Sequence, residues 1–127
     1  MTFATVRAAV AAQLTNDTEW STFAFPPAVP QPLSVVIEPD DPYIVSTNGK
    51  SSLHAMIRLR ARMYVPLLDN QGNLEQLERI ASLVRLAIVD ATQNVGDLSQ
   101  PQVLDIETGA LLTAYFPFET LAEWSTS

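Results

Sequence analysis

The residues best suited to chemistry in this chain are three arginines at alternate positions, Arg58, Arg60 and Arg62. The positions between them are apolar, and alternation with a period of two predicts a half-buried strand. The three guanidinium groups then share the open face of that strand at a spacing of about 6.6 Å. Like charges this close repel one another, so the arginines need counter-charges.

Those counter-charges have two possible sources, and the sequence leaves both open. The first is neighbouring strands of the same sheet, where Glu38, and Asp105 with Glu107, have the required alternation. The second is a neighbouring subunit, in which case the arginine face is a subunit interface. Direct DNA binding is least favoured, because 14 acidic and 7 basic residues give a net charge of −7.

No set of residues in the sequence predicts catalysis or metal binding. The only histidine, His54, has no nucleophile and orienting carboxylate near it in sequence, so a surface or interface role is expected. The chain has no cysteine, which excludes disulfides, thiolate zinc sites and a cysteine nucleophile. Phosphate-loop, zinc-protease, serine-hydrolase and calcium-loop motifs are absent, and the paired carboxylates (Asp40 with Asp41, Asp105 with Glu107) are too few for a metal cage. We therefore expect no enzyme activity, no metal and no cofactor.

The elements that position these residues begin with a helix over residues 2–14, where Thr2 is the expected N-cap. A short strand over 20–25 follows, and then a connector over 26–32 whose prolines keep it extended and unable to pair fully. The next strand covers 33–38. The apolar run near the N-terminus, 8–12, is too short to span a membrane.

Residues 39–52 predict an arm built as a hairpin. Asp40 and Asp41 lie in a turn between two prolines, and the Asn-Gly pair at 48–49 is a strong hairpin signal. Residues 43–47 are expected to pair back on the start of the long strand. Three apolar residues lie between the two turn-forming clusters and are candidates for contact with a neighbouring subunit: Tyr43, Ile44 and Val45.

The main core is predicted to form between the long strand, 53–65, and a long amphipathic helix over about 71–95 that ends before Gly96. One or two final strands cover 103–107 and 111–118, and the tail from 121 shows no clear pattern. The whole chain, 1–127, is expected to be one domain. Its predicted fold class is α+β, with the order α-β-β-β-α-β and two helices packed on a mostly antiparallel or mixed sheet of four to five strands.

This order of elements resembles the tail terminator proteins of long-tailed bacteriophages. The most similar stretches are P-D-D-P-Y-I-V at 39–45 and R-M-Y-V-P-L-L-D-N-Q-G-N-L-E-Q-L at 62–77. Small head-to-tail connector proteins encoded before the tail-tube protein carry comparable stretches. The resemblance covers most of the chain in pattern and rests on no invariant chemical motif.

The resemblance implies a virion protein, assembled in the host cytoplasm, that forms a hexameric ring at the head-proximal end of the tail. Its partners would be further copies of itself, the tail-tube protein and a head-completion protein. DNA would pass through the ring without specific binding, and Asp40 and Asp41 are the first candidates for lumen-facing acids. Two alternatives stay open: another head-tail connector that closes or joins the head, and a small dimeric ligand-binding α+β domain.

Overall fold

The computed structural model describes residues 2–15, 19–46, 53–67, 70–89, 94–107 and 109–124, without the side chains of 70–73. It contains two helices and a mixed sheet of six strands, which confirms the predicted class and element order, with one strand more than expected. In chain order the elements are α1 (Phe3–Leu14), β1 (Ser21–Phe23), β2 (Ser34–Ser46), β3 (His54–Pro66), α2 (Asn70–Ile88), β4 (Asn94–Val95), β5 (Gln102–Ile106) and β6 (Gly109–Glu123).

The long strand β3 lies at the centre of the sheet. The strand order is β1-β2-β3-β6-β4, and β5 also pairs with β6. Only β1 and β2 are parallel; the other pairs are antiparallel. β3 pairs with β6 along its whole length, from His54 opposite Glu123 to Pro66 opposite Leu111. This continuous register fixes which side chains of β2, β3 and β6 share a face.

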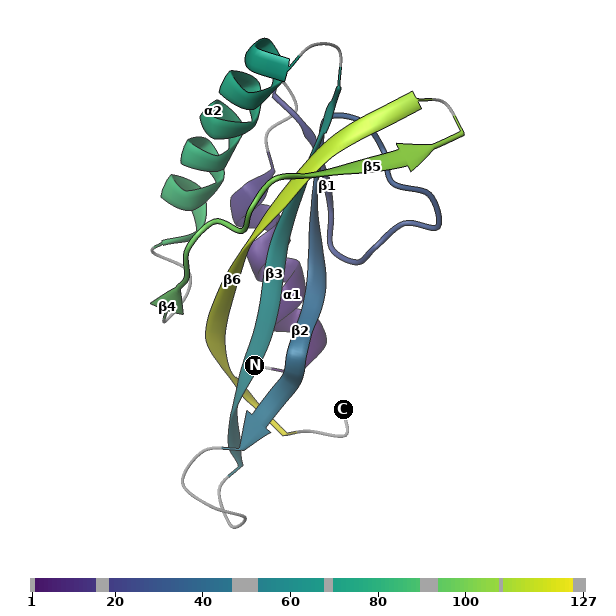
Figure 1. Cartoon of the computed structure of the whole chain (residues 1–127). Coiled ribbons are helices and arrows are strands. Elements are labelled where there is room, and N and C mark those ends of the chain that lie inside the picture. Colours follow the sequence, from purple (N-terminus) through teal and green to yellow (C-terminus); the bar gives the residue numbers. More distant parts are fainter. Residues whose placement is uncertain are drawn as a thin grey trace.

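Both helices pack on one face of the sheet, and no helix of the described residues lies on the other face (Figure 1). Thr2 caps α1 as predicted, since its Oγ1 accepts a hydrogen bond of 3.3 Å from the Thr5 backbone N–H. Every second residue of β3 is buried under the helices because strand side chains alternate between faces. The core joins these residues to apolar residues of both helices: Val6, Val10, Leu14, Ala55, Ile57, Leu59, Ala61, Met63, Val65, Leu77, Ile80, Ala81, Val84 and Ile88.

The predicted bounds of the long helix and of the last strand are wrong. The long helix expected over 71–95 is α2, which ends at Ile88, and residues 94–95 form β4 against Phe118 and Glu119. β4 covers an edge of β6 that would otherwise present unpaired backbone groups. The last strand does not stop at 118 but continues to Glu123, because β3 supplies a pairing partner along its whole length.

The predicted turn at 39–42 is a register shift inside one continuous strand. Pro39 lies opposite Leu59 and Ile44 lies opposite Ile57, so β2 carries extra residues between these two positions. The predicted pairing of the arm with the start of the long strand is confirmed for Ile44, Val45 and Ser46. Thr47 and the Asn-Gly turn at 48–49 lie outside the described residues.

In the part of the chain that the structure describes, no helix is long and apolar enough to cross a membrane.

Candidate functional site

The open face of the sheet holds the arginines and a set of acids that approach them from both sides. Because β3 lies between β2 and β6, each arginine has neighbours on two strands. Glu38 lies opposite Arg60, and Arg58 lies opposite Glu119. We call this set the charged ladder; its members are Glu38 and Asp40 on β2, Arg58, Arg60 and Arg62 on β3, and Tyr115 and Glu119 on β6.

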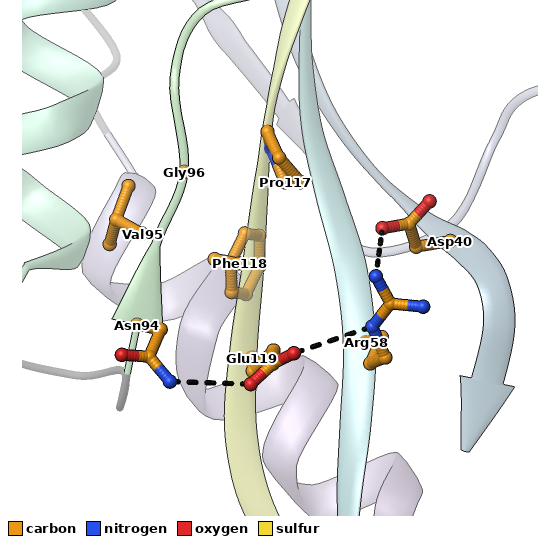
Figure 2. A pocket seen from close by; sticks show the side chains of 8 residues that line it. All are labelled: Asp40, Arg58, Asn94, Val95, Gly96, Pro117, Phe118 and Glu119. Atoms are coloured by element: carbon orange, nitrogen blue, oxygen red, sulfur yellow. Dashed lines mark hydrogen bonds and ion pairs between the residues drawn. The ribbon is translucent and has the colours of Figure 1, made fainter. Parts of the chain in front are cut away.

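Short ion pairs connect the charged ladder from end to end. Arg62 Nε donates to Glu38 Oε1 at 2.8 Å, and Arg60 Nε donates to Asp40 Oδ1 at 2.9 Å. Arg58 bridges two strands, with its Nη2 3.5 Å from Asp40 Oδ2 and its Nε 3.4 Å from Glu119 Oε1 (Figure 2). Three guanidinium groups thus meet three carboxylates, and the ladder carries no net charge.

Two of the guanidinium groups lie over the ring of Tyr115 on β6. The Arg60 and Arg62 guanidinium carbons lie 4.5 and 4.8 Å from the centre of its ring. A cation over an aromatic face is attracted by the ring quadrupole, by about 0.5–1 kcal/mol at exposed sites. Arg62 also lies 3.3 Å, through its Nη1, from the hydroxyl of Thr113. The guanidinium groups of Arg60 and Arg62 therefore lie against side chains of β6 while their charges stay paired.

The electrostatics of Asp40 follow from these contacts. Partial burial alone would raise its pKa, but three other effects outweigh burial and lower the pKa below its usual value. They are a hydrogen bond from the Asp41 backbone N–H, a hydrogen bond from Arg60, and the charges of Arg60 and Arg58. Burial alone would lower the pKa of Arg60, but the hydrogen bond to Asp40 and the charges of Asp40, Tyr115 and Glu38 together outweigh burial and raise this pKa. Both groups are therefore held in their charged forms.

Within the described residues, the structure tests the first source of counter-charge, the neighbouring strands of the same sheet. Glu38 pairs with Arg62, so the prediction of cross-strand ion pairs in the same chain is confirmed for this acid. The prediction for Asp105 and Glu107 is wrong, because β5 pairs with β6 and not with β3. A role of the arginine face at a subunit boundary stays a prediction.

Two acids of the ladder, Asp40 and Glu119, were not predicted as counter-charges from the sequence. Asp40 is two residues after Glu38 and continues its alternation. The flanking prolines predicted a turn at this position, so Asp40 was not assigned to the strand. Glu119 lies one residue beyond the predicted end of the last strand at 118. A last strand as long as β3, with which it pairs, would have included Glu119.

The three apolar residues of the arm do not share one environment. Tyr43 and Ile44 pack against the core on the helix side, where the Tyr43 hydroxyl accepts a hydrogen bond of 2.6 Å from Arg7 Nη1. Val45 lies on the open face opposite Met56 and is 39% exposed. Of the three interface candidates, Val45 offers the most exposed side chain.

Val45 belongs to a row of apolar side chains that crosses the open face at the hairpin end of the sheet. Met56 lies opposite Val45 on one side and opposite Leu121 on the other. Leu121 is 45% exposed. We call Val45, Met56 and Leu121 the apolar row; it borders the charged ladder at Arg58, two residues along β3 from Met56. Leu121 had no predicted role, because the tail showed no pattern in the sequence.

A cavity of about 230 Å³ lies beside the ladder, between β4 and the Arg58 side chain (Figure 2). Asn94 donates to Glu119 Oε2 at 3.3 Å across its mouth. The charged groups that line it, Asp40, Arg58 and Glu119, already pair with one another. Because these charged groups are already paired, the cavity offers little free charge for binding a ligand.

The remaining candidates lie apart from one another. The His54 imidazole is exposed at the end of β3, with its Nε2 3.8 Å from Glu123 Oε1. Asp41 is exposed beside the ladder, whereas Asp40 is engaged within it. Among the described residues, no group of three or more histidine, cysteine or acidic side chains is arranged to hold a metal ion.

Comparison of the chain with models of known protein families found no match, and comparison with curated proteins found none either.

Proposed function

We propose that this protein is a structural subunit of a long-tailed phage virion, similar to a tail terminator, that assembles into a ring on the tail tube and joins it to the head. The resemblance at residues 39–45 and 62–77 motivates the proposal. Both stretches contribute to the open face of the sheet: the first contains Asp40 and Val45, and the second begins at Arg62.

The observation that carries the proposal is the apolar row. Val45, Met56 and Leu121 come from three strands and form a continuous apolar stripe at one end of a helix-free face. Contiguous exposed apolar surface bordered by polar groups is typical of protein–protein contacts. Covering this stripe with a neighbouring copy would remove it from water, which favours association by about 25 cal/mol per Å² of apolar area.

The charged ladder supports the same role as the polar border of the contact. An unpaired buried charge is costly at an interface, but each arginine of the ladder already has a carboxylate within its own chain. A neighbouring subunit could therefore approach this face without leaving a charge unsatisfied.

The distribution of the remaining charge suits a ring around DNA. The ladder is neutral, so the net charge of −7 is spread over the rest of the chain. Exposed acids without an ion pair in the described residues lie on several elements: Asp41, Glu75, Glu78, Asp97, Asp105 and Glu107. A lumen lined by such acids would repel phosphate and let DNA pass without being held.

Assembly of the purified protein tests this proposal. Light scattering after size exclusion, with negative-stain microscopy, should show rings near six subunits for the natural chain. Leu121→Asp and Val45→Asp place a charge in the apolar row and should yield smaller species. The matched control is Leu86→Asp on α2, a leucine that is 72% exposed and lies outside the row; it should still form rings.

A strictly monomeric protein at high concentration, unchanged when tail-tube protein is added, would contradict the proposal. A dimer with a ligand-dependent melting temperature would favour the small ligand-binding domain instead. Rings that survive Leu121→Asp and Val45→Asp but not Leu86→Asp would place the contact on the helices.

A further inference from the structure

The outer edge of β5 is a second surface that the ring proposal does not use. β5 pairs with β6 along one edge, and no described strand pairs with its other edge. The Leu67 N–H donates to the Ala110 carbonyl at 3.0 Å, so Ala110 directs its backbone groups toward β3. Backbone direction alternates along a strand, so Leu111 and Thr113 face β5 and bond their partners Leu104 and Gln102.

It follows that Val103 and Asp105 direct their N–H and C=O groups away from β6. The Val103 side chain is 59% exposed, and no described strand pairs with this edge of β5. An open edge with outward N–H and C=O groups is a template for an added strand.

A cavity of about 580 Å³ lies next to this edge. One wall is the proline-rich connector, with Ala28, Val29 and Pro30, and the other is the end of β5 with Ile106 and its flanking acids. The volume is within the roughly 300–1,000 Å³ that ligand pockets commonly have. Pro30 has no N–H, so this wall cannot complete a ladder with β5 at that position. The connector thus bounds the space beside β5 without filling it.

The charge of this cavity points to the chemistry of its occupant. Asp105 and Glu107 line it, are exposed, and have no cationic partner among the described residues. An extended segment that alternates basic and apolar side chains fits these features. Its basic side chains would meet the two carboxylates, its apolar side chains the apolar wall, and its backbone the open edge.

A second copy of this chain is a poor source of such a segment. Each of its six arginines already makes a hydrogen bond or ion pair, with Tyr43, Glu38, Asp40, Glu119, Glu19 or the Gly96 carbonyl as acceptor. The one lysine, Lys50, lies outside the described residues. The exposed edge of β2 is also a poor partner for β5. Asp40 and Asp41 on this edge would repel the acids of the cavity, and Pro39 and Pro42 would interrupt strand pairing.

We propose that the outer edge of β5 binds an extended basic segment of a different protein, which adds as a strand and places its lysine or arginine side chains against Asp105 and Glu107. The backbone groups of Val103 and Asp105 supply the ladder bonds, and the connector wall receives the apolar side chains. This inference does not depend on ring formation and names the chemistry of a partner that is not another copy of the chain.

Binding of a designed probe to the full-length protein tests the inference. The probe is a fluorescein-labelled peptide with the sequence Lys-Val-Lys-Val-Lys, followed by fluorescence anisotropy. Two control peptides separate the contributions. Glu-Val-Glu-Val-Glu reverses the charge, and Lys-Pro-Lys-Pro-Lys keeps all three lysines but interrupts strand pairing. The first peptide should bind at least tenfold more tightly than either control.

Variants of the protein locate the site. Val103→Pro removes one outward N–H without removing a bond to β6 and should weaken binding at least tenfold, whereas Val103→Thr should bind as the natural chain does. Asp105→Asn combined with Glu107→Gln should weaken binding severalfold and reduce its dependence on salt. Should Val103→Pro fail to fold, amide exchange on the natural chain should show new protection at Val103 and Asp105 when the peptide is added.

Equal binding of the proline-containing peptide would overturn the inference, because it would reduce the interaction to charge attraction alone. Absence of binding, or binding that Val103→Pro leaves unchanged, would overturn it as well. Oligomeric state is measured in parallel, so a failure here is distinguishable from a failure of the ring proposal.

Discussion

Replacing Asp40 by asparagine should destabilise the fold by about 2 kcal/mol. Asp40 is the acid shared by two arginines, with its Oδ1 2.9 Å from Arg60 Nε and its Oδ2 3.5 Å from Arg58 Nη2, and its side chain is only 10% exposed. Asparagine keeps the size of the side chain but loses the charge. Arg58 would keep its ion pair with Glu119, whereas the one carboxylate left near Arg60 would be Glu38 at 4.0 Å. The amide oxygen of asparagine can still accept a hydrogen bond from Arg60, but without the negative charge that strengthens it.

The magnitude follows from the geometry of the two contacts. A hydrogen bond to a charged group contributes about 1.5–3 kcal/mol when it is well formed, which applies to the bond from Arg60. The longer contact with Arg58 adds little, and partial exposure of both arginines reduces the total. For a chain of this size, about 2 kcal/mol corresponds to a fall in melting temperature of roughly 6 °C.

The effect should also depend on pH in one direction. The pKa of Asp40 is lowered in the folded protein, so its charge contributes stability above the unfolded pKa of about 3.9. That contribution is lost as the pH falls through the lower folded pKa. The difference between the natural chain and Asp40→Asn should therefore be constant near pH 7 and shrink below about pH 4.

Urea unfolding followed by tryptophan fluorescence measures the effect, in the Leu121→Asp background so that assembly does not contribute to stability. The control is Asp105→Asn, which removes an exposed acid without an ion pair and should stay within about 0.5 kcal/mol of its parent. A cost for Asp40→Asn no larger than that of the control would refute the reasoning. So would a difference that is the same at pH 7 and pH 3.

Three further substitutions test the packing that positions the ladder, each read from urea unfolding. Gly96→Ala should lower the free energy of unfolding by about 1–3 kcal/mol, because a Cβ there would lie 2.7 Å from Pro117 Cγ. An unchanged urea midpoint would show instead that the chain at β4 can shift to make room for the Cβ. Leu59→Ala should cost about 2–5 kcal/mol, since this side chain is fully buried beneath the helices, and a cost under 1 kcal/mol would contradict that packing. Trp20→Phe should lower the free energy of unfolding by about 1 kcal/mol, because it removes the Nε1 donor to the Leu14 carbonyl at 2.9 Å. A neutral result would show that the hydroxyl of Thr22, which also donates to this carbonyl at 3.1 Å, satisfies it alone.

Much of this fold could be predicted because its main strand has an uninterrupted period of two. The alternation from Ala55 to Val65 is enough to predict that the arginines lie on the open face, without knowing which strands pair with this one. The N-cap at Thr2 and the pairing of Ile44 with the start of the long strand also follow from local signals. Such signals are strong where a single face is buried.

The rest depended on pairing between distant segments. Two prolines at 39 and 42 favour a turn locally, but pairing with β3 keeps the chain extended and places Asp40 on the ladder. β4 has only two residues, and its strand conformation is set by the edge of β6 rather than by its own sequence. Leu121 became part of a site only because β3 is long enough to pair with it.

The molar mass of the purified natural chain tests the central claim most directly. Six subunits of 13.9 kDa give a ring of about 83 kDa by light scattering, and Leu121→Asp should reduce this mass. A mass of one subunit at high concentration, the same in both proteins, would contradict the proposal that the apolar row joins subunits into a ring.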